Sequence, residues 1–369
     1  MSILLAAAVL FACDPVKNNP PQFETKEKTV LVYMVANNDL SSNAYNNLSD
    51  LKKGHIPDNG NILVYFHTPQ TSPLLLNVCK DDKGEVIQDT VYRFPSRNSA
   101  EPESLTSAMK VVATMFPAEE YGLFLWSHGT GWLPSGRYSK SFGSDNGVEM
   151  DIAELAEAIP YKLSFVVFDA CLMGSVEVAY ELKDSVDYVI SSPTEIRDLG
   201  FPYSRVMQHI FRSPSDLQAV AKEYYDYYNA FAGQARSASI SLVKTSELDG
   251  VAQAAAEIFG KYREELAVFN PAYVQRYFRG TRHWFYDLGD YVNLLAPQDA
   301  AEFNEAMEKA VIYKAATPKF FDITINPQKF SGLSVYIPSV AEDPQLDAYY
   351  ASLKWNMDTK LVDLQQEEE

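Results

Sequence analysis

Cysteine is scarce in this chain of 369 residues, in which Cys13, Cys79 and Cys171 are the only three. An odd, sparse set of cysteines excludes a fold held together by a framework of disulfides. Each cysteine therefore needs an explanation of its own. We interpret Cys79 as a small residue packed within a strand.

Several catalytic signatures are missing as well. The sequence contains no G-x-S-x-G nucleophile elbow, no H-E-x-x-H, no Walker loop and no G-x-G-x-x-G. Its five histidines show no metal-ligand spacing with one another or with cysteine. These absences argue against an α/β hydrolase of the serine type, a zinc peptidase and a nucleotide-binding enzyme. No metal ligand is assigned.

Positive charge is also in short supply. Lys and Arg number 31 against 49 Asp and Glu, which gives a net charge of -18. A nucleic-acid binder would need a basic surface, so we expect no nucleic-acid partner. Hydrophobic residues make up 47% and charged residues 22%, as in a globular protein with a sizeable core. We expect a monomer.

The first residues form a short apolar run, residues 2–12, that ends at Cys13. The run is too short to span a bilayer but has the length of a signal-peptide apolar region. Residues 10–13, Leu-Phe-Ala-Cys, resemble the lipobox of bacterial lipoproteins, in which the cysteine is acylated. No Lys or Arg precedes the run, and a buried core segment is the alternative. We predict a lipid anchor at Cys13, a tether over 14–27, and an extracytoplasmic domain in the periplasm or at the cell surface, with membrane contact through that anchor only.

Short apolar runs alternate with helical patterns along the first two thirds of the chain. We expect strands near 30–35, 62–66, 74–79, 86–94, 123–126, 163–168 and 188–190, and helices near 104–116, 152–159 and 174–182. Such alternation predicts an α/β fold with a mainly parallel sheet covered on both faces. Ligand sites in such sheets lie at the carboxyl ends of the strands.

The pattern changes after about residue 235. We expect a strand at 239–243, a helix over 247–259, helical aromatic-rich segments at 273–278 and 284–291, and strands at 321–325 and 333–337. The predicted organisation is thus a first domain over 28–235, an α+β region over 236–355 packed on the sheet, and an acidic tail over 356–369.

A histidine and a cysteine fall at two of the predicted strand ends. Ser127-His128-Gly129 follows one strand, and Asp169-Ala170-Cys171 follows the next. An imidazole beside a thiol can deprotonate it and later protonate the leaving amine. The backbone N–H groups of Gly129 and Cys171 would form an oxyanion hole. Either residue alone would be a structural strand-end residue, but together they predict a cysteine peptidase that acts on a peptide or protein substrate.

The segments 125–132 (LWSHGTGW) and 168–174 (FDACLMG) closely resemble the clostripain family of cysteine peptidases. Weaker matches lie at 32–40, 152–156 and 332–338. The resemblance implies a caspase-like three-layer αβα fold, the His128–Cys171 dyad, and cleavage after Arg or Lys in an acidic pocket. Asp169 matches the pocket aspartate of the family. Its alternative role is to orient the loop by accepting backbone N–H bonds.

Two further properties follow from this resemblance. The second pocket acid would be Asp198 or Glu195, although Arg197 lies between them. Self-cleavage is expected in the loop between the motifs, residues 134–147, after Arg137 or Lys140; an uncut surface loop is the alternative. No cofactor is required. Some members of the family depend on calcium, and Asp145 and Asn146 have suitable oxygens, but no EF-hand spacing is present.

A rival hypothesis belongs to a different class. A catalytically silent surface lipoprotein could use the same sheet to bind peptide or glycan. The complete His–Cys pair favours the peptidase.

Overall fold

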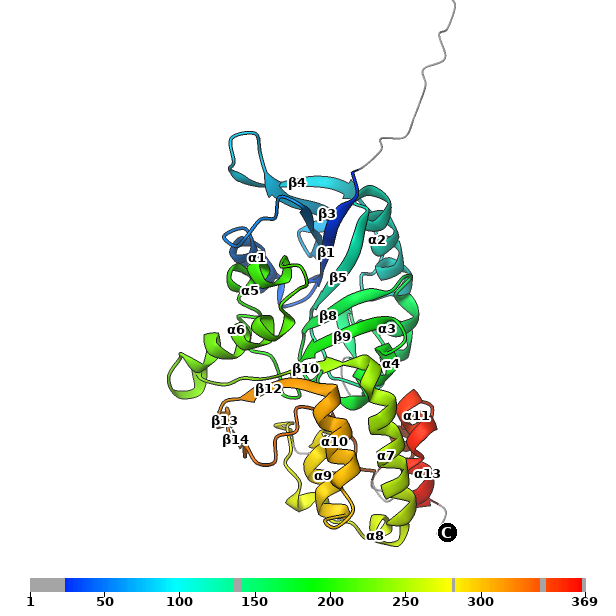
Figure 1. Cartoon of the computed structure of the whole chain (residues 1–369). Helices are drawn as coiled ribbons and strands as arrows, with labels where there is room; N and C mark the ends of the chain where they lie inside the picture. The colour runs from blue at the N-terminus through cyan, green and yellow to red at the C-terminus, as the bar shows by residue number, and fades with distance from the viewer. Residues whose placement is uncertain (1–23, 136–140, 281–282, 339–342, 367–369) are drawn as a thin grey trace, which may run out of the picture.

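The computed structural model describes residues 24–135, 141–280, 283–338 and 343–366. Its centre is a sheet of nine strands in the order β12-β10-β9-β8-β5-β1-β2-β3-β4 (Figure 1). The five middle strands run parallel to one another. In spatial order they are β9 (Val186–Ser191), β8 (Leu163–Asp169), β5 (Ala118–Trp126), β1 (Lys26–Val35) and β2 (Gly60–Thr68). The mainly parallel sheet predicted from the sequence is confirmed.

Antiparallel strands close the sheet at both edges. One edge is the hairpin of β3 and β4, whose two strands were expected. The other edge is formed by β10 and β12, of which β12 was not predicted because its side chains are mostly half-exposed and include a lysine. The bounds of these strands are β3 (Thr71–Lys80), β4 (Val86–Arg93), β10 (Ser239–Lys244) and β12 (Val311–Ala316).

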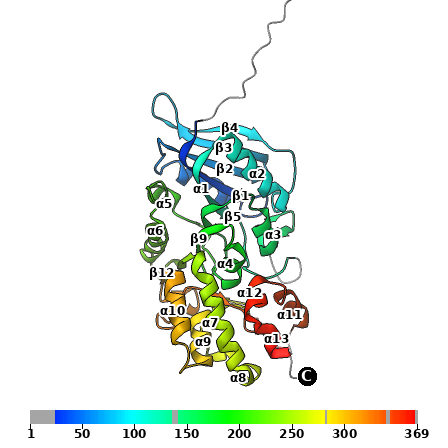
Figure 2. The same ribbon diagram turned by 45° about the vertical axis from the view of Figure 1, so that its right-hand side comes forward.

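Helices cover both faces of the sheet (Figure 2). On one face, apolar side chains of three helices join a core with β1, β2 and β10. On the other face, three further helices join a larger core that continues into the C-terminal region. Burial on both faces explains why the central strands are continuous apolar runs. The first set is α1 (Ser41–Leu51), α5 (Tyr203–Ile210) and α6 (Leu217–Asn229), and the second is α2 (Pro102–Met115), α3 (Ile152–Ala158) and α4 (Val176–Leu182).

The region after β10 is mostly helical and lies beside the β10–β12 edge (Figures 1 and 2). Its helices are α7 (Leu248–Lys261), α8 (Arg263–Ala267), α9 (Leu288–Leu295), α10 (Ala301–Ala310), α11 (Pro344–Tyr350), α12 (Lys354–Thr359) and α13 (Leu361–Gln366). Short strands pair β11 (Tyr286–Asp287) with β15 (Ser334–Val335), and β13 (Lys319–Phe320) with β14 (Ile323–Thr324). Single 3-10 turns are η1 (Gly233–Ala235), η2 (Thr245–Glu247) and η3 (Pro271–Tyr273).

Two aromatic-rich segments differ from the prediction. Residues 273–278 are not a helix: η3 ends there, and Arg276 forms a bridge with Tyr286 in an extended arrangement. Within 284–291 the helix begins only at Leu288, because Asp287 caps it. The aromatic rings thus pack from extended backbone, where the spacing of apolar residues had suggested a helix.

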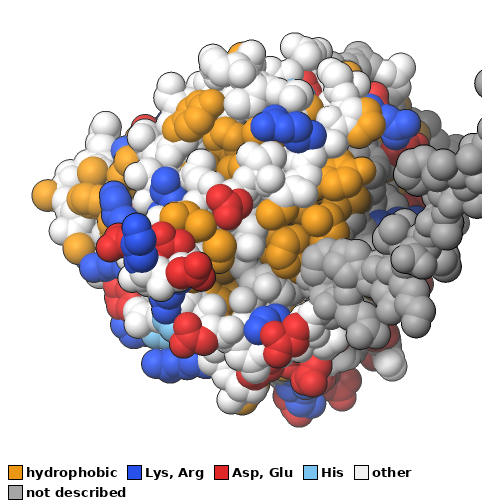
Figure 3. Space-filling view, turned by 90° about the horizontal axis from the view of Figure 1, so that it is seen from above, with side chains coloured by type: hydrophobic (Ala, Val, Ile, Leu, Met, Phe, Trp, Pro, Cys, Tyr) orange, Lys and Arg blue, Asp and Glu red, His pale blue; other side chains and the backbone are white. Residues whose placement is uncertain are grey.

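The predicted boundaries also differ from the structure. Strands β10 and β12 complete the main sheet, so the region after residue 235 is continuous with it. Most of residues 356–366, which were expected to belong to an acidic tail, lie instead in α12 and α13, and Leu361 and Val362 are buried. Within the described ranges, no helix has the length and apolar character needed to cross a bilayer. The end of the molecule at β3 and β4 carries hydrophobic side chains between scattered charges (Figure 3).

Candidate active site

Strands β5 and β8 bring the two predicted catalytic residues to the same edge of the sheet. The strands are parallel neighbours, and their last residues, Trp126 and Asp169, are register partners. His128 lies just after the first strand and Cys171 just after the second. The topology predicted from the sequence therefore places both loops side by side.

Gly129 shows how closely these loops approach each other. A Cβ atom at this position would lie 2.8 Å from the carbonyl oxygen of Cys171 and 3.0 Å from Sδ of Met173. Only glycine permits this contact. Leu172, directly after the cysteine, has a φ of 62°, a left-handed conformation that costs a non-glycine residue about 1 kcal/mol or more. Such backbone strain is typical of functional sites.

The imidazole of His128 is held by an aspartate. Its Nε2 lies 2.8 Å from Oδ1 of Asp39, which follows the end of β1. Nδ1 is then the ring nitrogen left to exchange a proton with another group. Asp39 was not named from the sequence as a site residue. Its position after the neighbouring parallel strand was the signal that could have identified it.

The thiol of Cys171 is half-buried and contacts the loop after β9. The backbone N–H of Ile196 donates to Sγ at 3.3 Å, and the S–H group faces the carbonyl oxygen of Ile196 at 3.6 Å. Burial raises the pKa of this thiol to about 12, although the Ile196 N–H opposes the shift. The cysteine is thus protonated in this conformation, and among the described residues its hydrogen-bond partner is Ile196 rather than His128.

Two backbone N–H groups at the site have no hydrogen-bond acceptor among the described residues. Neither the N–H of Gly129 nor that of Cys171 donates to another residue in the described ranges. The adjacent Thr130 N–H, in contrast, donates to the carbonyl oxygen of Ser141 at 2.9 Å. Free N–H groups beside a nucleophile are the donors that an oxyanion requires.

A short hairpin forms one wall of the site. It consists of β6 (Phe142–Asp145) and β7 (Val148–Met150). The N–H of Gly143 donates to the carbonyl oxygen of His128 at 3.0 Å. The hairpin was not predicted, because the sequence around it has the composition of a loop.

The end of this hairpin is anchored by Asp145. Its buried carboxylate accepts bonds from Asn37 Nδ2 at 2.6 Å and the Ser99 N–H at 2.7 Å, and it lies 3.1 Å from Nδ1 of His67. The His67 and Ser99 bonds lower its pKa despite burial. Its oxygens are thus already occupied by protein groups. The described residues contain no cluster of His, Cys, Asp and Glu that could hold a metal, and a calcium requirement remains a prediction.

The three candidate pocket acids have different surroundings. Asp169 is buried, and its Oδ2 accepts the Phe201 N–H at 3.0 Å and the Tyr203 hydroxyl at 2.9 Å. Burial raises the pKa of Asp169 to about 6. These bonds correspond to the loop-orienting role that was its alternative interpretation. Asp198 is exposed, with Oδ1 3.9 Å from a guanidinium nitrogen of Arg197.

Glu195 precedes the residue that contacts the nucleophile and forms an ion pair with Arg279. Arg279 comes from the C-terminal region and was not predicted to lie at the site. Arg279 is far from Glu195 along the chain, so no sequence pattern indicated this contact.

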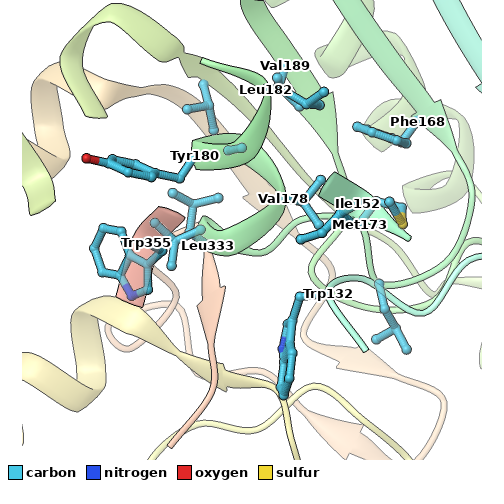
Figure 4. Close-up of a cluster of buried hydrophobic side chains, with 14 of the residues drawn as sticks. Trp132, Ile152, Phe168, Met173, Val178, Tyr180, Leu182, Val189, Leu333 and Trp355 are labelled. Carbon is cyan, nitrogen blue, oxygen red and sulfur yellow. The ribbon is translucent and has the colours of Figure 1, made fainter. Parts of the chain in front are cut away.

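The C-terminal region also supports both catalytic loops. The N–H of Ser334 donates to the carbonyl oxygen of Gly174 at 2.9 Å, next to the cysteine loop. Trp132, which ends the histidine motif, is buried in the hydrophobic core (Figure 4). Its ring centroid lies 4.8 Å from that of Tyr336 and 4.9 Å from that of Tyr350. The C-terminal region thus contacts the histidine motif through an aromatic cluster and the cysteine motif through a backbone hydrogen bond. Three other predicted residues, Cys13, Arg137 and Lys140, lie outside the described residues.

Comparison with known proteins gives a consistent result. The family model described as the clostripain family matches residues 32–365. Clostripain of Hathewaya histolytica is 24% identical over 231 residues, which span 51% of this chain and 43% of that protein. The chain therefore matches less than half the length of this curated relative.

Solved structures resemble the chain over nearly its whole length. An inactive zymogen of a C11 protease from Parabacteroides distasonis is 36% identical, with a TM-score of 0.81, and the match covers 91% of this chain and 99% of the other. A secreted C11 cysteine protease from Bacteroides thetaiotaomicron, solved with an irreversible peptide inhibitor, is 28% identical, with a TM-score of 0.80 and coverage of 90% and 99%. The fold is caspase-like, as in these C11 proteases, and the chain belongs to the clostripain family.

Proposed function

We propose that this protein is a cysteine endopeptidase in which Cys171 is the nucleophile and His128 the general acid and base. The observation that carries the proposal is the meeting of two loops at neighbouring strand ends, where Gly129 contacts the carbonyl of Cys171. Members of the same family, one of them solved with an irreversible peptide inhibitor, support the reaction class.

The reaction takes place in two stages. His128 takes the proton of the Cys171 thiol, and the sulfur attacks the carbonyl carbon of the scissile bond. The N–H groups of Gly129 and Cys171 stabilise the oxyanion. The C–N bond then breaks as the imidazolium gives its proton to the amine, which leaves a thioester. Water, deprotonated by His128, attacks that thioester, and the released thiolate regains a proton as the carboxylic acid departs.

The substrates proposed are peptides with Arg or Lys before the scissile bond. The carboxylates of Asp169, Glu195 and Asp198 lie on the elements around the nucleophile, and carboxylates pair strongly with guanidinium and ammonium groups. Self-cleavage after Arg137 or Lys140 and acylation of Cys13 complete the proposal. They would give a processed peptidase anchored outside the cytoplasm.

Turnover of fluorogenic peptides tests the proposal. Purified protein is incubated with peptides carrying Arg, Lys or norleucine at P1, beside the variant Cys171→Ala. The control is Cys79→Ala, which removes the other cysteine of the described residues, in the edge hairpin. We expect activity in the wild type and in the control only. Equal rates for wild type and Cys171→Ala would overturn the peptidase and favour a silent binding protein.

A further inference from the structure

The segment that carries Arg279 is fixed at its base. The N–H of Tyr277 donates to the carbonyl oxygen of Phe285 at 2.9 Å, and the Asp287 N–H donates to that of Gln275 at 2.7 Å. The buried hydroxyl of Tyr277 donates to Asp287 at 2.6 Å. Arg279 thus extends from an anchored pair of extended segments, and its position at the nucleophile is a consequence of tertiary packing.

The guanidinium of Arg279 is bound on two sides. Its Nε donates to Oε2 of Glu195, and its Cζ lies 4.4 Å from the ring centroid of Phe321. A carboxylate together with an aromatic face is a binding site for a guanidinium group. The ion pair is partly shielded from solvent, with side-chain exposures of 40% for Arg279 and 25% for Glu195.

This ion pair lies next to the nucleophile. Glu195 is followed directly by Ile196, whose N–H donates to Sγ of Cys171. Both charges of the pair act on the pKa of the thiol: Glu195 raises it and Arg279 lowers it. A substrate whose carbonyl carbon is at Cys171 has its P1 side chain close to this loop. A cationic P1 group would therefore approach the Glu195 carboxylate at the position that the Arg279 guanidinium already occupies.

We infer that Glu195 is the carboxylate that receives the P1 cation, and that Arg279 is its internal ligand, displaced when a substrate binds. The inference rests on the proposed peptidase function and adds to it a specificity residue and a built-in competitor. A cationic P1 side chain displaces Arg279 and forms a new ion pair with Glu195. A neutral P1 side chain displaces Arg279 without forming a new ion pair. The apparent affinity for every substrate is the intrinsic affinity multiplied by the fraction of molecules in which Arg279 has left the carboxylate.

Binding to an inactive background tests this inference separately from catalysis. Fluorescein-labelled peptides with Arg or norleucine at P1 are titrated against Cys171→Ala and its double variant with Arg279→Ala. We expect the second change to tighten binding of the P1-Arg peptide roughly three- to fivefold, the range of a partly exposed ion pair. The control is Arg276→Ala, whose guanidinium contacts His283 instead of Glu195. It should leave the affinity unchanged.

The variant Glu195→Gln provides the converse test. It should weaken binding of the P1-Arg peptide but not that of the P1-norleucine peptide, which gains nothing from the Glu195 charge and no longer has to break the ion pair. An unchanged or weaker affinity in Arg279→Ala would overturn the inference, as would equal weakening of both peptides by Glu195→Gln. If thermal unfolding shows that Arg279→Ala is not folded, Arg279→Gln retains most of the side-chain stem and gives the same comparison. Failure of the peptidase proposal appears separately, as equal turnover by wild type and Cys171→Ala.

Discussion

The Nε2 atom of His128 lies 2.8 Å from Oδ1 of Asp39, and the two residues follow neighbouring parallel strands. This bond orients the ring, and in the proposed mechanism it would stabilise the positive charge that the imidazole gains. Asp39 is largely exposed, so its contribution is modest. We predict that Asp39→Asn lowers kcat about two- to tenfold, measured with a P1-Arg fluorogenic peptide. The exposed Asp58, paired with Lys80, provides the control Asp58→Asn; unchanged kcat in Asp39→Asn would contradict the assignment.

Replacing Gly129 should disrupt the site without unfolding the protein. The new methyl group of Gly129→Ala would press on the Cys171 carbonyl oxygen, which is backbone and cannot rotate away. We predict a loss of about 100-fold or more in kcat/KM, because small displacements of reacting groups are costly. The expected loss of stability is about 1–3 kcal/mol. Gly250→Ala, in helix α7 with open space around it, should leave kcat/KM unchanged. Similar effects of both changes on activity would exclude the close-approach argument.

The buried carboxyl of Asp169 makes stability depend on pH. Its pKa is raised from 3.8 to about 6, so the folded state holds this proton more tightly than the unfolded state. The corresponding stabilisation is complete below about pH 4 and is lost as the pH rises through 6, with an upper size of about 3 kcal/mol. Asp169→Asn does not titrate, so the destabilisation it causes should be larger at pH 4.5 than at pH 7.5. Urea unfolding at both pH values measures this, and a pH-independent difference would refute the role of burial.

Self-cleavage should leave the two pieces associated. Residues just after the proposed cut are hydrogen-bonded to the histidine loop. The Thr130 N–H donates to the carbonyl oxygen of Ser141, and the Gly143 N–H donates to that of His128. We predict two bands on a denaturing gel and one unchanged peak in gel filtration. Cys171→Ala and the double variant Arg137→Ala/Lys140→Ala should both remain single chains. Fragmentation of the double variant at the same position would rule out these two residues.

Acylation at the N-terminus can be tested apart from catalysis. We predict that cells expressing the protein incorporate an alkyne-tagged fatty acid into it and that Cys13→Ser abolishes the label. Cys79→Ser, which changes a half-buried residue of β3, should retain the label. An unlabelled wild-type protein would show that the apolar run has another role.

The parts of the fold that sequence patterns predicted are those with strong periodicity. The five parallel strands and helices α2, α3 and α4 have continuous apolar runs or regular helical spacing, and they appear where expected. Helix α1, which connects β1 to β2, was not predicted. Strand β12 was not predicted, because its side chains are mostly half-exposed and it pairs with the distant strand β10. The hairpin of β6 and β7 was not predicted, because its strands are short and the sequence around them has the composition of a loop. The prediction of a helix over 273–278 was wrong, because this segment is extended and pairs with Tyr286 through a bridge at Arg276.

The candidate site divides in the same way. His128, Gly129 and Cys171 could be placed together because each follows a strand and the crossover rule makes those strands neighbours. The burial of Asp169 could not be foreseen, because it depends on Phe201 and Tyr203. Arg279 reaches Glu195 from a different part of the chain, and only tertiary structure reveals such a contact.

The bond from Ser334 to the carbonyl of Gly174 has a consequence for how this protein can be divided. The turn behind the nucleophile is supported by a strand from near the end of the chain, and β10 and β12 cover what would otherwise be the open edge of β9. A fragment ending near residue 235 would expose that edge to intermolecular pairing and leave the cysteine turn without its support. The last third of the chain is therefore a structural requirement of the reaction centre and cannot be removed as a separate module.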